Sequence, residues 1–237
     1  MSRLLYFIFS VFLLNFYSCT SNETGNSKEI NSDAVFFDYK VRGEEKDSSI
    51  TLYIQFKKGG PNGAALVLDK PASVQLDGEE IKVGSAKLTG AFYEIRKPSH
   101  SFSGKHTILF TGFDNRDYAE EFVYRSFQLK TKLPAIFNRG DLALDFEGLG
   151  PEDYIRVIAI DTSFTSRDIN EIDTVMNGRL VISASKLKNL VNGPIVLQLS
   201  RETDKAVKNG TKVGGRIVVS YGLQREFELI SRALKAP

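Results

Sequence analysis

Apolar residues at every second position are the feature that most constrains the fold of this sequence. The segment from residue 50 to 56 is the clearest example, and its apolar members are Ile50, Leu52, Ile54 and Phe56. Because successive side chains of an extended chain point to opposite sides, this spacing places one set toward a core and the other toward solvent. The segment is therefore predicted to be a half-buried β-strand.

Similar segments recur along the chain and are separated by turn residues. Further strands are predicted at Val35–Val41, Val74–Leu76, Glu80–Val83, His106–Thr111, Glu121–Leu129, Tyr154–Asp161, Arg179–Ser183, Ile195–Ser200, Arg216–Tyr221 and Arg225–Ile230. Asp77 and Gly78 suit a tight hairpin, because both turn residues take positive φ in its preferred form. The one convincing helical turn is Ser185–Leu190. Many short strands with turns between them favour antiparallel sandwiches, so the predicted fold class is mainly β.

The length of the chain sets its domain organisation. The 237 residues, less a short N-terminal region, leave room for two domains of about 100 residues each. A boundary is expected near Lys130 to Pro134, because a proline restrains its own φ and that of the residue before it. We therefore predict two β-sandwich domains in tandem, over residues 33–131 and 132–237.

The N-terminus carries a targeting pattern. Arg3 is followed by an apolar run from Leu4 to Phe16 and then by Tyr17, Ser18 and Cys19. A charged start, a short apolar segment and a small residue before the cut are typical of a secretory signal, and the run is too short to span a bilayer. The segment resembles a bacterial lipoprotein signal. That resemblance implies a signal peptide over residues 1–18 and a lipidated Cys19 as the first residue of the mature protein.

The resemblance also implies a location. Acyl chains on Cys19, of the palmitate kind, would make the membrane a partner of the protein, and more than one chain holds a protein stably. Residues 19–32 are polar and are predicted to form a flexible tether. Loose signals of this kind occur in Bacteroidetes lipoproteins, and Thr20, which is not aspartate, favours the outer membrane of the cell envelope. The periplasmic or surface face stays open, and secretion without lipid or a short uncleaved anchor are the alternatives.

A second resemblance lies between Leu180 and Leu197. This stretch is similar to the corner between the fifth and sixth strands of bacterial immunoglobulin-like repeats, where a short turn with two leucines precedes an Asn-Gly pair and a core strand. Leu187 and Leu190 are three residues apart and can plug the open end of a sandwich. The resemblance implies two immunoglobulin-like modules. Pro194 departs from the pattern and suggests that the strand after it starts at a sheet edge.

Charge and cysteine content exclude several partners and bonds. The chain has 31 basic and 29 acidic residues, so it lacks the strong positive field expected of a nucleic-acid binder, and we expect no nucleic acid partner. Cys19 is the single cysteine, and no disulfide can form once it is lipidated.

Residues able to perform catalysis are sparse. The two histidines are His100 and His106, and Ser99 beside His100 is a sequence neighbour without a nucleophile-elbow motif. The pairs Glu44-Glu45, Glu79-Glu80 and Glu120-Glu121 are adjacent, so in a strand their members point to opposite faces and cannot flank a glycosidic bond. We predict no catalytic residue, no cofactor and no enzyme activity.

Asp161, Asp168, Glu171 and Asp173 form the most interesting polar group. They bracket the loop from Thr162 to Asn170, and carboxylates on a loop can bind calcium. The spacing and glycine of an EF-hand are absent, so a charged solvent loop is favoured and no metal ligand is assigned. Whether the loop binds calcium stays open.

Three further features each have a simple and a functional interpretation. The glycine-rich break from Gly59 to Gly63 lacks the Gly-Lys-Ser/Thr ending of a phosphate loop and is read as a strand connection. The run from Lys205 to Lys212 either attracts acidic partners or forms a polar hairpin loop, and the loop is favoured. Some aromatic residues can stack on sugars or fill the cores, and the core interpretation is favoured for Phe36, Phe37, Tyr39, Phe92 and Tyr93.

Three functional hypotheses follow. The leading one is a noncatalytic, lipid-anchored envelope protein whose two modules bind an unknown protein or polysaccharide through loops or sheet edges. The second is a structural spacer or accessory subunit of an envelope complex, which an exposed apolar patch on one sheet would favour. The third is an enzyme of unfamiliar type, which a deep pocket joining Asp161, Asp168 and a histidine would favour.

Overall fold

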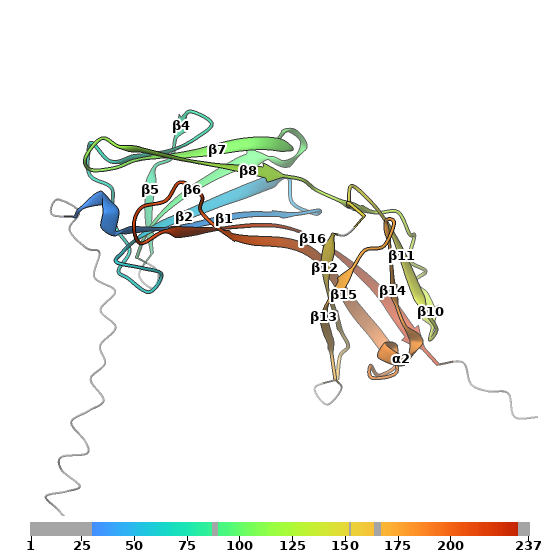
Figure 1. Ribbon diagram of the computed structural model, residues 1–237. Coiled ribbons are helices and arrows are strands. Elements are labelled where there is room, and N and C mark those ends of the chain that lie inside the picture. The colour runs from blue at the N-terminus through green and yellow to red at the C-terminus, as the bar shows by residue number, and fades with distance from the viewer. Residues whose placement is uncertain (1–29, 87–89, 152, 164–166, 232–237) are drawn as a thin grey trace, which may run out of the picture.

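The computed structural model describes residues 30–86, 90–151, 153–163 and 167–231, and nearly all of their regular structure is strand (Figure 1). The strands are β1 Val35–Glu44, β2 Ser49–Lys58, β3 Ser73–Leu76, β4 Glu79–Glu80, β5 Val83–Ala86, β6 Gly90–Pro98, β7 Gly104–Thr111, β8 Asp117–Tyr124, β9 Gln128–Leu129, β10 Ile136–Asn138, β11 Leu142–Glu147, β12 Tyr154–Ile160, β13 Ile169–Thr174, β14 Arg179–Ile182, β15 Gly193–Ala206 and β16 Gly215–Ile230. The helical elements are the 3-10 turns η2 Ser32–Ala34 and η3 Ser99–Ser101 and the short helix α2 Ala184–Leu187. The prediction of a mainly β fold is confirmed.

One large sheet runs through the molecule and two smaller sheets cover it. The large sheet has the order β13-β12-β15-β16-β1-β2-β6-β5, and β10 also pairs with β16. Its pairs are antiparallel except those of β16 with β1 and with β10, which are parallel. The smaller sheets have the orders β4-β3-β7-β8 and β14-β11-β9. We call the half around β1, β2 and β4-β3-β7-β8 the first sandwich and the half around β12, β13 and β14-β11-β9 the second sandwich.

The hairpin of β15 and β16 belongs to both sandwiches. Residues 215–222 of β16 pair with β1 in the first sandwich, whereas residues 228–230 pair with β10 in the second. Residues 196–200 of β15 pair with β12, and among the described strands residues 201–206 have only β16 as a neighbour. Figure 1 shows both strands running without a break from one lobe of the molecule into the other.

Both smaller sheets cover the same face of the large sheet. The buried residues Ile217, Tyr221, Phe227 and Leu229 of β16 are an even number of positions apart, so their side chains point to one side of the strand. Ile217 and Tyr221 lie in the first sandwich, and Phe227 and Leu229 lie in the second. As a result, the buried apolar side chains of the two sandwiches form one connected cluster.

Four aromatic rings fill the junction between the sandwiches. Phe127, which follows β8, packs edge-on against Tyr221 of β16 and Phe146 of β11, with ring centroids 5.3 and 5.9 Å apart. Tyr221 also meets Tyr124 of β8 at 6.4 Å. Edge-to-face packing of this kind is favourable beyond the area that it buries. The junction is therefore packed core.

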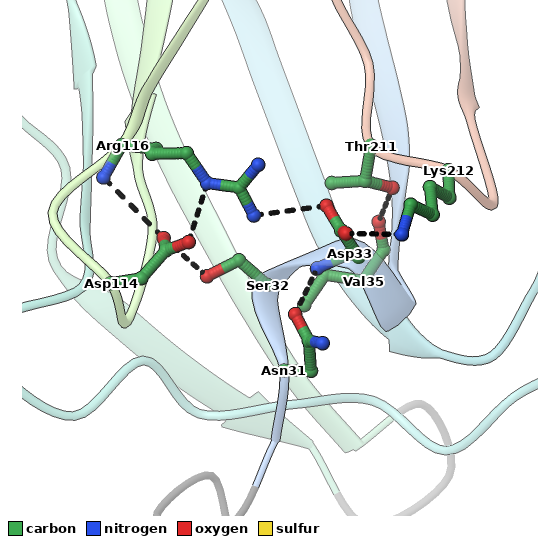
Figure 2. A network of polar contacts seen from close by, with 8 residues as sticks. All are labelled: Asn31, Ser32, Asp33, Val35, Asp114, Arg116, Thr211 and Lys212. Atoms are coloured by element: carbon green, nitrogen blue, oxygen red, sulfur yellow. Dashed lines mark hydrogen bonds and ion pairs between the residues drawn. The ribbon is translucent and has the colours of Figure 1, made fainter.

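A polar network fixes the first described residues to the first sandwich, as Figure 2 shows. The carboxylate of Asp33 lies 3.0 Å from Arg116 of the β7–β8 turn and 3.0 Å from Lys212 of the β15–β16 turn. Ser32 donates a hydrogen bond to Asp114 at 2.8 Å. Hydrogen bonds from Lys212 and Arg116 lower the pKa of Asp33, although the partial burial of its carboxyl opposes them. The chain therefore enters the fold at a fixed point beside two turns.

Several local predictions are confirmed. Asp77 and Gly78 have φ of 50° and 85° and connect β3 to β4 in a tight hairpin. Leu187 and Leu190 are buried, as expected of residues that close the end of a sandwich. Pro194 precedes the residues of β15 that pair with β12, so it removes no hydrogen bond from that ladder.

Three predicted strand assignments are wrong. The segment predicted as Glu80–Val83 contains the end of β4 and the start of β5, with two residues between them that are not strand. The segments predicted as Arg216–Tyr221 and Arg225–Ile230 are one strand, β16, because Gly222 continues the extended backbone. Gly222 pairs with Glu44 of β1 and does not form a turn. The strand predicted as Glu121–Leu129 ends at Tyr124, and β9 follows it.

The structure adds to the predicted domain organisation. Residues 1–29, which contain the predicted signal and most of the tether, lie outside the described residues. Ile30 and Ser32 are buried, so the folded region already includes the end of the predicted tether. The domain bounds 33–131 and 132–237 stay a prediction, and the strands on the two sides of that boundary share the large sheet.

Candidate ligand-binding site

A cavity of about 410 Å³ opens where two strand edges approach each other. One edge is β8, the last strand of the four-stranded sheet, and the other is the part of β15 that has no neighbour besides β16. Side chains from both edges line the cavity, together with residues 219–221 of β16. We call this cavity the basic pocket, for the reason that follows.

Five cationic side chains line the basic pocket, and they are Lys105, Arg125, Arg201, Lys205 and Lys208. Two carboxylates accompany them. Glu121 lies 2.7 Å from Lys105, and Asp153 lies 3.4 Å from Arg201. In the described part of the chain, Arg125, Lys205 and Lys208 have no carboxylate within ion-pair distance. The pocket therefore carries an excess of positive charge.

The positions of the cations follow from the alternation along β15. Arg201, Thr203 and Lys205 stand opposite Tyr221, Val219 and Ile217 of β16, and cross-strand partners point to the same face. This is the face that the smaller sheets cover elsewhere. Because β8 is the last strand of its sheet, the end of β15 extends beyond the cover and polar residues occupy the inward positions.

Arg201 closes the pocket toward the second sandwich. Its side chain is only 16% exposed, and it donates to the backbone carbonyl of Arg125 and to Asp153. These contacts join β15 to the end of β8 and to the loop before β12. Arg201 is therefore a structural cation as well as a lining residue.

The turn after β15 holds Lys208 at the other end of the pocket. The backbone N–H of Lys208 donates to the buried carboxylate of Glu120 at 2.8 Å, and the amide of Asn209 donates to the carbonyl of Ala119 at 2.9 Å. Both acceptors belong to β8. The turn is thus fixed to the strand opposite, and the side chain of Lys208 reaches the pocket from a defined position.

Apolar side chains form the floor of the pocket. Phe122 and Tyr221 are buried, and Val219 is half-buried beside them. Burial of the ring, with a smaller contribution from Glu45 and Glu44, raises the pKa of Tyr221, and burial does the same for Tyr124 behind it. These phenols therefore stay neutral, and the charge of the pocket comes from its cations.

The predicted acidic group is divided among separate contacts. Asp161 accepts hydrogen bonds from the backbone N–H groups of Ser163 and Val191 at 2.7 Å each. Glu171 and Asp173 lie in β13 and face Lys186 at 2.5 and 3.5 Å, and the hydrogen bond that Lys186 donates to Glu171 raises the pKa of that lysine. Asp168 is exposed.

Residues 164–166 of this loop are not among the residues that the structure describes. Among the residues that the structure does describe, no group of three or more His, Cys, Asp or Glu side chains is placed to hold a metal ion. Calcium binding by this loop therefore stays open, as in the sequence-based prediction.

The structure places the histidines apart from each other and from Asp161. His106 lies 2.7 Å from Asp77 and stacks on Phe102 with centroids 3.9 Å apart. His100 lies in η3, beside a small cavity of about 140 Å³ that Glu44 and Glu45 also line. Glu45 pairs there with Arg225 at 2.5 Å, and this hydrogen bond lowers its pKa despite its burial.

The remaining predicted features have simple positions. Cys19 lies outside the described residues, and no helix within them is long and apolar enough to cross a membrane. Gly59 to Gly63 connect β2 to the next segment. Of the aromatic residues singled out, the buried ones are Phe36, Phe37, Tyr39 and Tyr93. Phe92 is half-buried on the outer face, where it stacks on Tyr53 with centroids 5.2 Å apart.

Sequence reasoning found part of the basic pocket and missed the rest. The run from Lys205 to Lys212 includes Lys205 and Lys208, but Lys105, Arg125 and Arg201 were not singled out. A signal for Arg201 was present, since Ile195, Leu197 and Leu199 alternate and the same spacing then continues with Arg201, Thr203 and Lys205. Lys105 and Arg125 join the site only through the pairing of β7 with β8.

No family model matches this chain, and no curated protein matches it in sequence. Among solved structures, DIP-gamma IG1+IG2 is 12% identical with a TM-score of 0.23, and the match covers 78% of this chain and 94% of that one. The Yersinia pseudotuberculosis adhesin InvE is 10% identical with a TM-score of 0.25, covering 83% and 61%. A Bacteroides ovatus SGBP-B, solved in complex with a mixed-linkage heptasaccharide, is 12% identical with a TM-score of 0.18, covering 80% and 61%. Similarity at this level does not indicate what this chain binds.

Proposed function

We propose that the protein is a noncatalytic, lipid-anchored module of the cell envelope that binds a protein or polysaccharide ligand in the basic pocket. The observation that carries the proposal is the approach of Arg125, Lys205 and Lys208 to one cavity, where no described carboxylate neutralises them. Cations that face a concave site attract anionic groups and raise their local concentration. If these cations had only a structural role, ordinary salt bridges with nearby carboxylates could neutralise them equally well.

The junction between the sandwiches suits such a site. Tyr221 and Phe127 pack there in a continuous core, and Arg201 joins the two strand edges that form the pocket. A site on packed strands keeps its geometry better than a site on mobile loops. The pocket is therefore prepared for a ligand before binding.

A lipid anchor is part of the same proposal. A lipidated Cys19 holds the protein at the outer membrane, and the tether from Cys19 sets the reach of the folded region. Asp33 fixes the entry of the chain between Arg116 and Lys212. Under this proposal, the end of the fold that carries Asp33 is the one nearest the membrane.

Lysine footprinting tests occupancy of the pocket without assuming a ligand. The full-length protein is acetylated in isolated envelopes and after purification, and modification of each lysine is measured by mass spectrometry. We expect Lys205 and Lys208 to react less in envelopes than in the purified protein, whereas the exposed Lys58 and Lys82 react equally. Equal reactivity of Lys205 and Lys208 in both samples would show that the pocket has no ligand in the envelope.

The anchor is tested by Cys19→Ala. We expect this variant to lose metabolic labelling with a fatty acid and to leave the detergent fraction. Cys19→Ser is the conservative companion, because it keeps the size of the side chain without the thiol that carries the lipid. Fatty-acid labelling of either variant would remove the anchor from the proposal.

A structural role is the second candidate, and a patch on the second sandwich favours it. Tyr154 is 62% exposed and Ile172 is 60% exposed, and their pairing partners place them on the same outer face of β12 and β13 as Ile160. Exposed apolar residues in a group often mark a protein contact. A photo-cross-linker at Ile172 that captures an envelope protein, while one at Lys82 captures none, would favour this role.

A further inference from the structure

The unpaired cations of the basic pocket define the charge of what it can bind. Arg125 comes from the end of β8, Lys205 from β15 and Lys208 from the turn after β15. Three cations from separate segments face one volume, and the two carboxylates present are already engaged by Lys105 and Arg201. A ligand with more than one negative group therefore complements the site better than a neutral one.

The edge of β8 beside the pocket is partly occupied by other groups. An extended peptide that adds to an edge needs a run of free backbone groups. The carbonyl of Ala119 in β8 already accepts from Asn209, and the carbonyl of Arg125, just after β8, already accepts from Arg201. The turn that carries Lys208 also binds the side chain of Glu120, next to Ala119. These contacts disfavour an acidic polypeptide bound as an added strand along β8, and the poly-L-glutamate probe described below tests binding along β15.

The size and floor of the pocket favour compact rings. Its volume of about 410 Å³ lies at the lower end of the range usual for small-molecule sites. The floor of Phe122, Val219 and Tyr221 offers apolar surface below a charged rim. A sugar ring has apolar C–H faces and polar edges, so a carboxylated sugar matches this arrangement.

We propose that the basic pocket binds carboxylate-bearing sugar units of an acidic polysaccharide. Arg125, Lys205 and Lys208 contact the carboxylates, and the floor contacts the sugar ring. The proposal rests on the proposed function, since it names the ligand class of the same pocket.

A different explanation of the same residues makes a distinct prediction. Charged side chains that point inward on an edge strand can prevent edge-to-edge association of sheets. If Arg201 and Lys205 have only that role, then removal of the lysine charge promotes self-association and no polysaccharide binds.

The experiment uses three probes with the full-length protein in nonionic detergent. Polygalacturonate carries a carboxylate on each sugar, dextran is a neutral polysaccharide, and poly-L-glutamate carries the same charged group on a polypeptide. Binding is measured by isothermal titration calorimetry at low and moderate salt.

The test variant is Arg125→Gln/Lys205→Gln/Lys208→Gln, and the control Lys58→Gln/Lys70→Gln/Lys82→Gln removes three exposed lysines outside the pocket. Circular dichroism and the unfolding midpoint establish that both variants fold.

We expect polygalacturonate to bind and dextran not to bind. The pocket variant should bind polygalacturonate at least about tenfold more weakly, a change of about 1.4 kcal/mol, whereas the control keeps most of its affinity. Affinity should fall as salt rises, because the contacts are charged and partly exposed.

Four results would overturn the proposal. They are no binding of polygalacturonate, equal binding of dextran, tighter binding of poly-L-glutamate at the same residues, and equal loss in the control variant. If Lys205 and Lys208 are protected in the envelope but the purified protein does not bind polygalacturonate, the proposed function stands and the proposed ligand class is rejected. Self-association of the pocket variant without any loss of binding would assign the cations to edge protection.

Discussion

Asp38 places a buried carboxylate among three cations on the outer face of the large sheet. Its side chain is 3% exposed and lies 2.8 Å from Lys57, 3.1 Å from Arg216 and 3.8 Å from Lys40. Burial is the largest influence on the pKa of Asp38 and raises it, but the hydrogen bonds from Lys57 and Arg216 together outweigh burial. The pKa is therefore lowered from its model-compound value of 3.8. Three strands meet at this carboxylate, so its charge state affects the stability of the sheet.

We expect acid to destabilise the protein through this residue. Because the pKa of Asp38 is lower in the folded state, its contribution is complete above the unfolded pKa and is lost as the pH falls below about 4. Asp38→Asn should lower the free energy of unfolding by about 3 kcal/mol at neutral pH, since it leaves Lys57 and Lys40 without their carboxylate partner. The substitution should also make the free energy of unfolding fall less between neutral and acidic pH. Denaturant unfolding at several pH values measures both, and the exposed Asp47→Asn, which is expected to shift neither by more than about 0.5 kcal/mol, is the control.

The turn between β15 and β16 depends on one buried side chain of the opposite sheet. Glu120 accepts from the backbone N–H of Lys208, and its other oxygen has no partner among the described residues. Glu120→Leu should cost about 1–3 kcal/mol, because the N–H of Lys208 loses its acceptor. Hydrogen exchange at the Lys208 amide should accelerate in Glu120→Leu but not in Glu120→Gln, which keeps an acceptor. Unchanged exchange in Glu120→Leu would mean that other contacts hold the turn, and the outward-facing Glu121→Gln is the matched control.

The elements differ in how far the sequence predicts them. The apolar residues Ile50, Leu52, Ile54 and Phe56 of β2 stand at every second position and Asp77-Gly78 has the residues that its turn requires, so local rules suffice for both. β13 was missed because Asn170, Glu171 and Asp173 give it the polar composition of a loop, and its pairing with β12 provides the hydrogen bonds that its composition does not indicate.

The basic pocket was also predicted only in part from local sequence patterns. The sequence indicated Lys205 and Lys208 as one charged run, because neighbours in sequence can be counted. Lys105 and Arg125 meet them only because β8 ends the four-stranded sheet opposite β15. Tertiary pairing of this kind depends on the register of two sheets, and a pattern within one segment does not contain it.

At the scale of the whole molecule, the shared sheet and the connected core predict that the two sandwiches unfold together. The hairpin of β15 and β16 contributes to both, and the ring of Phe127 contacts Tyr221 and Phe146 across the junction. Two independent domains would have separate cores and could melt separately. The full-length protein should therefore give a single calorimetric transition whose van't Hoff and calorimetric enthalpies agree.

Phe127→Ala tests this coupling directly. The substitution removes a buried ring that contacts both sandwiches, so it should cost about 3–5 kcal/mol and lower the transition temperature. If the junction transmits stability, near-ultraviolet circular dichroism and calorimetry should report the same lowered midpoint. Val123→Ala, at a side chain that is 48% exposed, should change the midpoint little. Two resolved transitions in the wild-type protein, or a shift confined to one of two transitions in Phe127→Ala, would show that the sandwiches are energetically independent despite their common strands.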